Sequence, residues 1–217
     1  MTDAATVARD QPLIAIDVVP VSFTTADGLR VATARRAYDP FAGLEALPGV
    51  LLDAAERLVD GAQRALRTKT GIDAAAVRHL AQVGAFDGPS RDPRDTAISI
   101  AFLAVVDPVV DAPPAVWRRP DQGDPRLPFD HDAIVRTAVD QVRTRLWRDV
   151  PLTRALLGEV FPTSAAAQLH AALHGSAPDA GNLNRSLRTN PALVRATAPA
   201  TTGTRGGRPP ATWTWTD

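Results

Sequence analysis

The stretch LPGVLLDAAERLVDGAQRALRTKTGI, residues 47–72, decides the fold. From Asp53 to Thr70 its apolar side chains recur three and four positions apart, which is the spacing of a helix with one buried face. Gly71 follows as a residue that tolerates the left-handed conformation in which many helices end. The pattern therefore predicts an amphipathic helix over 53–70. Its apolar face would consist of Ala55, Leu58, Val59, Ala62 and Leu66.

Runs of β-branched residues on both sides of this helix predict strands. Residues 13–24 form one such run, and Gly28 ends a turn that leads into a return strand over 29–35. Two more strands are expected over 77–84 and 96–106. One amphipathic helix among strands of this kind favours a mixed α/β sandwich over a doubly wound sheet.

The same stretch resembles the Nudix box, G-x5-E-x7-R-E-U-x-E-E-x-G-U, in which U is aliphatic. Aligned without gaps, Glu56 takes the place of the first glutamate, Arg64 that of the arginine, and Gly71 that of the last glycine. Residues 35–41 and 90–102 resemble the flanks of this box in the ADP-ribose pyrophosphatases of the superfamily. The resemblance implies an N-terminal Nudix-type α/β/α sandwich, which we assign to residues 1–126.

The chain departs from the box where the chemistry of the family resides. Val50 replaces the first glycine, and Ala65, Thr68 and Lys69 replace the three clustered catalytic glutamates. Nudix hydrolases need those carboxylates because they gather divalent cations on the diphosphate of the substrate. Without them we expect no metal site, no catalytic residue and no hydrolase activity.

A Nudix fold that lacks its catalytic residues can still be a binding site. Arginine guanidinium groups suit diphosphate and ribose-phosphate oxygens, because they form paired hydrogen bonds with them. The alternative for Arg91 and Arg94 is a surface ion pair with Asp92 or Asp95. No cofactor is expected. The candidate ligand-binding residues are Arg35, Arg36, Glu56, Arg64, Lys69, Arg91 and Arg94.

Basic and acidic side chains are balanced over the chain but not within its halves. The 217 residues include 24 of each sign, which gives a net charge of zero. Residues 1–126 carry 14 basic and 17 acidic side chains, whereas residues 127–217 carry 10 and 7. From residue 180 to 216 there are five arginines and no acid, which is the charge pattern of a surface that contacts a phosphate backbone. A solvated arginine-rich tail is the alternative.

Composition and hydropathy exclude several classes of protein. With no cysteine, the chain has no disulfide scaffold, no thiolate metal site and no cysteine nucleophile. No apolar run approaches the ~20 residues of a membrane helix, and no signal peptide is visible. We therefore expect a cytoplasmic protein without a membrane partner. Six prolines between residues 107 and 129 predict an extended linker between two domains.

The second half of the chain changes from strands to helices. Two short strands, 193–196 and 212–215, flank a glycine- and proline-rich turn. Helices followed by such a β-ribbon are in the order of a winged helix-turn-helix, so the whole chain is expected to be an α+β protein. The predicted helices cover 130–147, 152–160, 165–174 and 179–188.

Three short motifs in this half resemble the Nudix-related transcriptional regulators, the NrtR family. LPFDH at 127–131 resembles the segment that leads into the linker helix of that family. NLNRSL at 182–187 resembles its recognition helix, and GRP at 207–209 with the strand at 213–215 resembles its wing. The resemblance implies a DNA-binding domain over 127–217 and a homodimer on a palindromic operator. It also implies repression of genes for NAD synthesis or salvage, in response to ADP-ribose or a related nucleotide.

The candidate DNA-binding residues carry groups that suit base edges and phosphates. Thr163 and Ser164 would hold a phosphate at a helix N-terminus, although plain N-capping by Thr163 is the alternative. His170 and His174 share a helix face but have no acidic third ligand nearby, so no zinc site is expected. The DNA-binding candidates are Thr163, Ser164, Asn182, Asn184, Arg185, Arg188, Arg205 and Arg208.

Two other functions stay open from the sequence. The first is an active Nudix hydrolase that cleaves ADP-ribose or a similar nucleoside diphosphate derivative with metal ligands outside the box. The second is a scaffold whose C-terminal helices only dimerise and bind no DNA.

Overall fold

The computed structural model describes residues 11–88, 91–108, 113–121, 123, 126–196 and 211–216. Its central element is a seven-stranded mixed sheet, with β1 (Leu13–Thr24) in the middle. β1 runs parallel to β6 (Ala97–Val106) and antiparallel to β2 (Gly28–Arg35). The other strands of this sheet are β3 (Glu45–Ala46), β4 (Gly49–Leu51), β5 (Val77–Phe86) and β7 (Ala115–Arg118).

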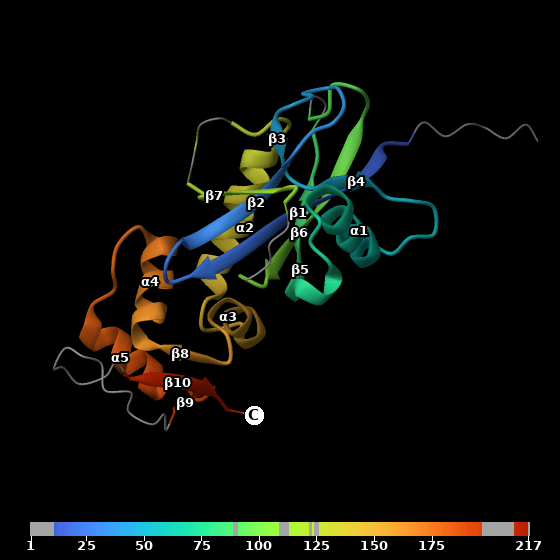
Figure 1. Cartoon of the computed structure of the whole chain (residues 1–217). Coiled ribbons are helices and arrows are strands. Elements are labelled where there is room, and N and C mark those ends of the chain that lie inside the picture. Colours follow the sequence, from blue (N-terminus) through green and yellow to red (C-terminus); the bar gives the residue numbers. More distant parts are fainter. Residues whose placement is uncertain are drawn as a thin grey trace, which may run out of the picture.

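Helices cover both faces of this sheet (Figure 1). Successive side chains of a strand point to opposite faces, so Ile16 and Val18 belong to the buried cluster under α1 (Leu58–Thr70), whereas Val19 and Val21 belong to the one under α2 (His131–Arg145). A 3-10 turn over Ala74–Ala76 leads from α1 to β5. The predicted α/β/α sandwich is confirmed.

Helix α1 begins at Leu58 rather than at Asp53. Residues 53–57 form a turn instead, in which Ala55 has a φ of 64° and the Asp53 N–H donates to the Glu56 carboxylate at 3.0 Å. The predicted end of the helix is confirmed, because Gly71 adopts the left-handed conformation with a φ of 73°.

The proline-rich segment contains a strand that its composition does not predict. Residues 115–118 form β7, which pairs antiparallel with residues 31–34 of β2. Prolines are tolerated beside such a strand, because it lies off the main path of the sheet and needs hydrogen bonds on one side only. A division of the chain at residue 126 falls between β7, a strand of the large sheet, and α2, which packs on that sheet.

The C-terminal part is a winged helix-turn-helix. Its first helix is α3 (Val150–Leu157), followed by α4 (Thr163–His174) and α5 (Ala180–Thr189). The predicted helix over 152–160 is wrong at its end, because Val160 begins a strand that pairs with β10. The small sheet therefore has three strands rather than two, in the order β8-β10-β9. These strands are β8 (Val160–Pro162), β9 (Leu193–Arg195) and β10 (Thr212–Trp215).

The winged helix shares its apolar core with one face of the large sheet. Phe161 and Leu169 belong to the same buried cluster as Val19 and Leu103, which lie on β1 and β6. Helix α4 contacts β2, and α3 contacts β1, β5 and β6 (Figure 1). The two parts of the chain are thus packed directly on each other. In the described part of the chain no helix is long and apolar enough to cross a membrane.

Candidate functional site

The two residues that match the Nudix box hold each other. Arg64 donates from Nε and Nη2 to the two carboxylate oxygens of Glu56, both at 2.7 Å, and a further Nη2 bond at 2.8 Å reaches the Leu51 carbonyl. The bonds from Arg64 lower the pKa of Glu56 to about 2. This pair fixes the turn that precedes α1, because the same carboxylate also accepts the Asp53 N–H.

The positions of the missing glutamates lie on two sides of α1. Ala65 is fully buried against the sheet, whereas Thr68 and Lys69 are exposed, and the Thr68 hydroxyl donates to the Arg64 carbonyl at 2.7 Å. No group of three or more His, Asp or Glu side chains that could hold a metal occurs in the ranges that the structure describes. The helix presents a positive charge where hydrolases of this kind present carboxylates.

Arg91 lies inside the protein rather than on its surface. Its guanidinium donates to both carboxylate oxygens of Asp130 at 2.8 and 3.0 Å and to Asp17 at 3.2 Å. Burial opposes the charge on Arg91, but the hydrogen bonds and charges of Asp130 and Asp17 outweigh it and raise its pKa. Asp17 also accepts the Ser99 hydroxyl at 2.6 Å. The surface ion pair with Asp92 or Asp95 is therefore wrong for Arg91, which faces away from solvent.

Arg36 and Arg94 meet at the ring of Phe129. Their Cζ atoms lie 4.8 and 5.9 Å from the ring centroid, and Phe41 packs edge-on against the same ring at 5.0 Å. Burial, and then the charge of Arg94, lower the pKa of Arg36, which forms no ion pair with any described residue. Arg94 is held by Asp92 at 2.7 Å, which confirms the surface ion pair for this residue. Guanidinium groups beside an aromatic ring can bind an anion, and the same group of side chains can pack against a planar ring.

Arg35 and Lys69 stand apart from this cluster. Arg35 is exposed at the end of β2, and Lys69 is exposed in the last turn of α1. Of the seven ligand candidates, the structure therefore groups Arg36 with Arg94 and Glu56 with Arg64. The rings of Phe41 and Phe129 complete the first group, and spacing alone could not reveal them, because they are 88 positions apart in sequence. Their only signal was that each follows a proline.

His131 is buried beside this cluster. The Leu47 N–H donates to its Nδ1 at 3.0 Å, and its Nε2 lies 3.6 Å from Asp17. Because Nδ1 accepts a hydrogen bond, the ring is neutral and carries its proton on Nε2. Burial lowers the pKa of His131 despite the opposing charges of Asp17 and Asp130.

We expect the folded state to lose stability as the pH falls below about 6.5, the unperturbed pKa of histidine, because the unfolded chain binds the proton that buried His131 resists. His131→Asn keeps an acceptor for the Leu47 N–H but does not titrate. Urea midpoints at pH 7.5 and 5.5 should therefore differ less in this variant than in the wild type. His79 and His170, whose pKa values burial also lowers, remain in both proteins. Equal differences would contradict the assignment to His131.

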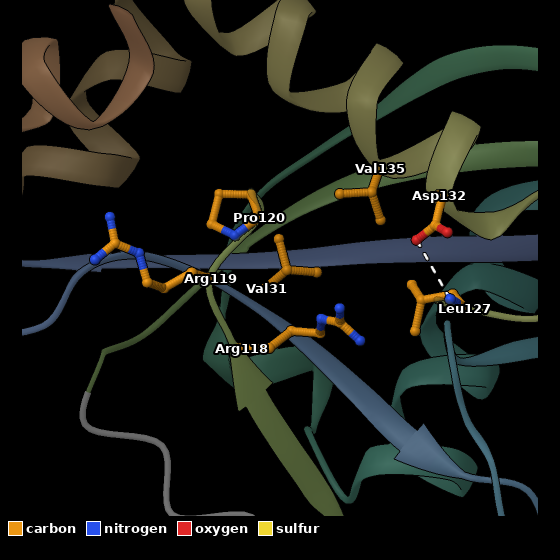
Figure 2. A pocket seen from close by; sticks show the side chains of 7 residues that line it. All are labelled: Val31, Arg118, Arg119, Pro120, Leu127, Asp132 and Val135. Atoms are coloured by element: carbon orange, nitrogen blue, oxygen red, sulfur yellow. Dashed lines mark hydrogen bonds between the residues drawn. The ribbon is translucent and has the colours of Figure 1, made fainter. Parts of the chain in front are cut away.

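Two hollows in the described part of the chain are lined by residues other than Arg36, Arg94 and Phe129. Figure 2 shows residues that line a hollow between β2, β7 and α2, with a hydrogen bond from the Leu127 N–H to Asp132. The hollow has a volume of about 10 Å³, and the hydrogen bond is 3.4 Å long. That volume suits one water molecule, whereas ligand pockets occupy about 300–1,000 Å³. A cleft of about 580 Å³ lies between β5 and α3, but Arg78 in its wall is paired with Asp107, and none of its lining residues was a ligand candidate.

Helix α5 presents a basic face to solvent. Leu183 and Leu187 are buried against the small sheet and α4, which leaves Asn182, Arg185 and Arg188 exposed on the other side. The expected cap is confirmed, since the Asp179 carboxylate accepts the Asn182 N–H at 2.8 Å. Neither arginine forms an ion pair within the part of the chain that the structure covers. The nearby Arg195 on β9 is also exposed.

Asn184 and the start of α4 are arranged differently. The Asn184 amide donates to the Ala180 carbonyl of its own helix at 2.8 Å. The N-cap alternative for Thr163 is wrong, because Pro162 occupies the N-cap and the Thr163 hydroxyl instead donates to Ala211 and accepts the Trp213 indole N–H at 2.8 Å. Thr163 thus fastens β10 to α4.

Three DNA-binding candidates and the two histidines of α4 remain. Ser164 is exposed in the first turn of α4. Arg205 and Arg208 lie outside the described residues. His170 and His174 stack on each other, with their ring centroids 4.1 Å apart.

The sequence pattern of the NUDIX domain matches residues 15–146 of this chain. The chain belongs to the Nudix family. A curated Nudix relative, the ADP-ribose pyrophosphatase of Methanocaldococcus jannaschii, is 30% identical over 117 residues, which cover 49% of this chain and 64% of the relative. The match thus spans less than two thirds of that relative.

Solved structures share the fold of this Nudix protein over nearly its whole length. The NrtR of Shewanella oneidensis in complex with a 27mer DNA superposes with a TM-score of 0.74 at 21% identity, and covers 94% of this chain and 93% of its own. A MutT/nudix protein from Enterococcus faecalis gives 0.75 at 21% identity, over 96% and 88%. The Nudix domain of the same NrtR with ADP ribose gives 0.55 at 24% identity, over 65% and 99%. The α+β fold of a Nudix domain with a C-terminal winged helix is confirmed.

Proposed function

We propose that this Nudix protein is a transcriptional repressor whose affinity for DNA responds to ADP-ribose or a related nucleotide. The observation that carries this proposal is the exposed face of α5 on the winged helix, where Arg185 and Arg188 have no carboxylate partner among the described residues. A helix of this kind, placed second in a helix-turn-helix, is the element that reads the major groove. The fold shared with an NrtR that was solved on DNA supports it.

The effector would bind at the arginine–aromatic cluster. Arg36 and Arg94 would hold the diphosphate, and the rings of Phe41 and Phe129 would pack against the sugar or base. The complex of the NrtR Nudix domain with ADP ribose supports this class of ligand. Arg35 and Lys69 stay candidates for outer phosphate contacts, whereas Glu56 and Arg64 would shape the site through their mutual bonds.

The experiment that tests the proposal is a DNA-binding assay on selected operator fragments, with and without ADP-ribose. The protein should bind as a homodimer to a palindromic site, and genomic matches to that site should lie before genes of NAD synthesis or salvage. DNA affinity should change by at least about fivefold at saturating ADP-ribose, as expected for an allosteric effector. Unchanged affinity would contradict the regulatory role, and the absence of any preferred site would contradict the repressor.

Arg36→Ala should weaken ADP-ribose binding about 10- to 100-fold, because hydrogen bonds from a charged donor contribute about 1.5–3 kcal/mol. Titration calorimetry with the full-length protein measures this. Arg57→Ala is the matched control, since Arg57 is an exposed arginine at the start of α1. Equal affinities of the two variants would show that the ligand does not bind at the arginine–aromatic cluster.

The alternative function is ADP-ribose hydrolysis, and the pyrophosphatase relative favours it. Our proposal includes the absence of this activity, because Ala65, Thr68 and Lys69 supply no carboxylate for a divalent cation. Release of AMP from ADP-ribose with Mg²⁺ or Mn²⁺ distinguishes the two. Turnover of about 1 s⁻¹ or faster, which is in the range of ordinary enzymes, would establish the hydrolase.

A further inference from the structure

Three consecutive residues at the N-terminal end of α2 contact separate segments of the Nudix domain. We call them the α2 head (Phe129, Asp130 and His131). Phe129 is contacted by Arg36 from the loop after β2 and by Arg94 from the loop before β6. Its backbone has a φ of 60°, a left-handed conformation that is strained for an aromatic residue. Such a conformation persists because the surroundings hold it.

The other two residues of the α2 head make buried polar contacts. Asp130 accepts two hydrogen bonds from Arg91, whose guanidinium also pairs with Asp17 of β1. His131 accepts the N–H of Leu47, the first residue of the stretch that resembles the Nudix box. The side chains of Arg91, Asp17 and His131 are each less than a tenth exposed, whereas that of Asp130 is 23% exposed.

The far end of the same helix contacts the winged helix. Arg143 donates from Nε to the Leu173 carbonyl in the last turn of α4 at 2.5 Å, and Asp140 orients its guanidinium. Two residues earlier on α2, Gln141 donates to the Val83 carbonyl of β5 at 2.7 Å. Helix α2 therefore connects the cluster of Arg36, Arg94 and Phe129 at one end with the winged helix at the other.

We infer that the α2 head is the positioning element through which an effector at Arg36 and Arg94 alters the winged helix. This inference rests on the proposed function and adds the path of its regulation. An anion that draws Arg36 and Arg94 from the ring of Phe129 removes the contacts that hold its left-handed backbone. Arg94 and Arg91 lie on one short loop, so a movement of Arg94 also displaces the pair between Arg91 and Asp130. Helix α2 then shifts, and its bond to the Leu173 carbonyl carries the shift to α4.

Asp130→Asn tests the inference with the least damage to the fold. It weakens the link between the loop and α2 but leaves the buried pair of Arg91 with Asp17. Asp132→Asn is the matched control, because Asp132 supplies the same negative charge to the first turn of α2 and accepts the Leu127 N–H instead. Both variants should retain ADP-ribose binding within about threefold of the wild type, since neither carboxylate contacts the cluster directly.

Hydrogen–deuterium exchange of the full-length protein provides a readout that needs no DNA. In the wild type, saturating ADP-ribose should change exchange both in the loop around Arg94 and in α4. In Asp130→Asn the loop should still respond, whereas the change in α4 should fall at least fivefold. The control Asp132→Asn should show the wild-type change in α4 exchange. It should also keep the wild-type ratio of DNA affinities with and without ligand.

An α4 response of wild-type size in Asp130→Asn would overturn the inference, and so would ligand binding that leaves α4 unchanged in the wild type. Arg91→Lys serves as the second variant, because it keeps the buried charge but loses the paired hydrogen bonds. Should Asp130→Asn fail to fold, the α4 response is measured in Arg91→Lys instead, and a response of wild-type size there would overturn the inference. A wild type that shows the α4 response but binds no DNA would contradict the repressor and leave the coupling intact.

Discussion

Replacing Arg185 and Arg188 together by alanine is expected to reduce operator affinity by about 100-fold or more. Each side chain stands exposed on α5 with no ion pair among the described residues, so its charge is available to DNA. An arginine that reads a base contributes about 1–3 kcal/mol, and loss of a phosphate contact removes a released counterion. The slope of log affinity against log salt should therefore become shallower by up to about 2. Fluorescence anisotropy at several salt concentrations measures both effects.

The matched control is Arg136→Ala, which removes an exposed arginine from α2. The control should bind DNA as the wild type does, because Arg136 lies on α2, outside the winged helix, and donates to the Asp132 carbonyl. The outcome that contradicts the prediction is retention of operator affinity in the double variant. Intact partner binding together with no DNA affinity in the wild type would favour the scaffold alternative.

Phe161→Ala is expected to lower the free energy of unfolding by about 3–5 kcal/mol, as large aromatic truncations in a core do. The side chain is 1% exposed and packs between Trp147 and Trp215, with ring centroids 6.2 and 5.6 Å away. For a chain of this length the thermal midpoint should fall by about 6–20 °C. Calorimetry measures the midpoint.

The same variant should destabilise both parts of the chain. Phe161 belongs to the buried cluster that includes Val19 and Leu103 of the large sheet, so the winged helix and that face of the sheet should unfold together. Val160→Ala on the same strand is the control, because this side chain is more than half exposed and should cost little. The prediction is contradicted if the winged helix of Phe161→Ala unfolds alone while the sheet amides keep their wild-type protection from hydrogen exchange. The two cores would then be independent.

Sequence patterns predicted the helices and strands that are determined by residues close together in the chain. The run of β-branched residues over 13–24 predicted β1, and Gly71 ended α1 because it adopts the conformation that other residues disfavour. The start of α1 could not be predicted in this way. Ala55 continues the apolar spacing, but Glu56 bonds to Arg64 and to the Asp53 N–H, and these bonds stabilise a turn.

Contacts between distant residues account for the errors. Val160 satisfies helical spacing, yet it pairs with Thr214, more than fifty positions along the chain. Arg91 occurs in a loop rich in charge, which suggests a surface ion pair, but its partners Asp17 and Asp130 come from elements that only the folded sheet brings together. The resemblance of short motifs could locate the winged helix, because their order along the chain carries information that spacing within one element lacks.

The buried carboxylate of Asp17 also limits which residue can occupy position 49. A Cβ at Gly49 would lie 2.2 Å from the Asp17 Oδ1 atom, so no larger residue fits while that carboxylate is present. The neighbouring position, where the Nudix box has its first glycine, carries Val50 without such a conflict. A side chain at position 49 would therefore displace the Asp17 carboxylate and disturb its buried pair with Arg91.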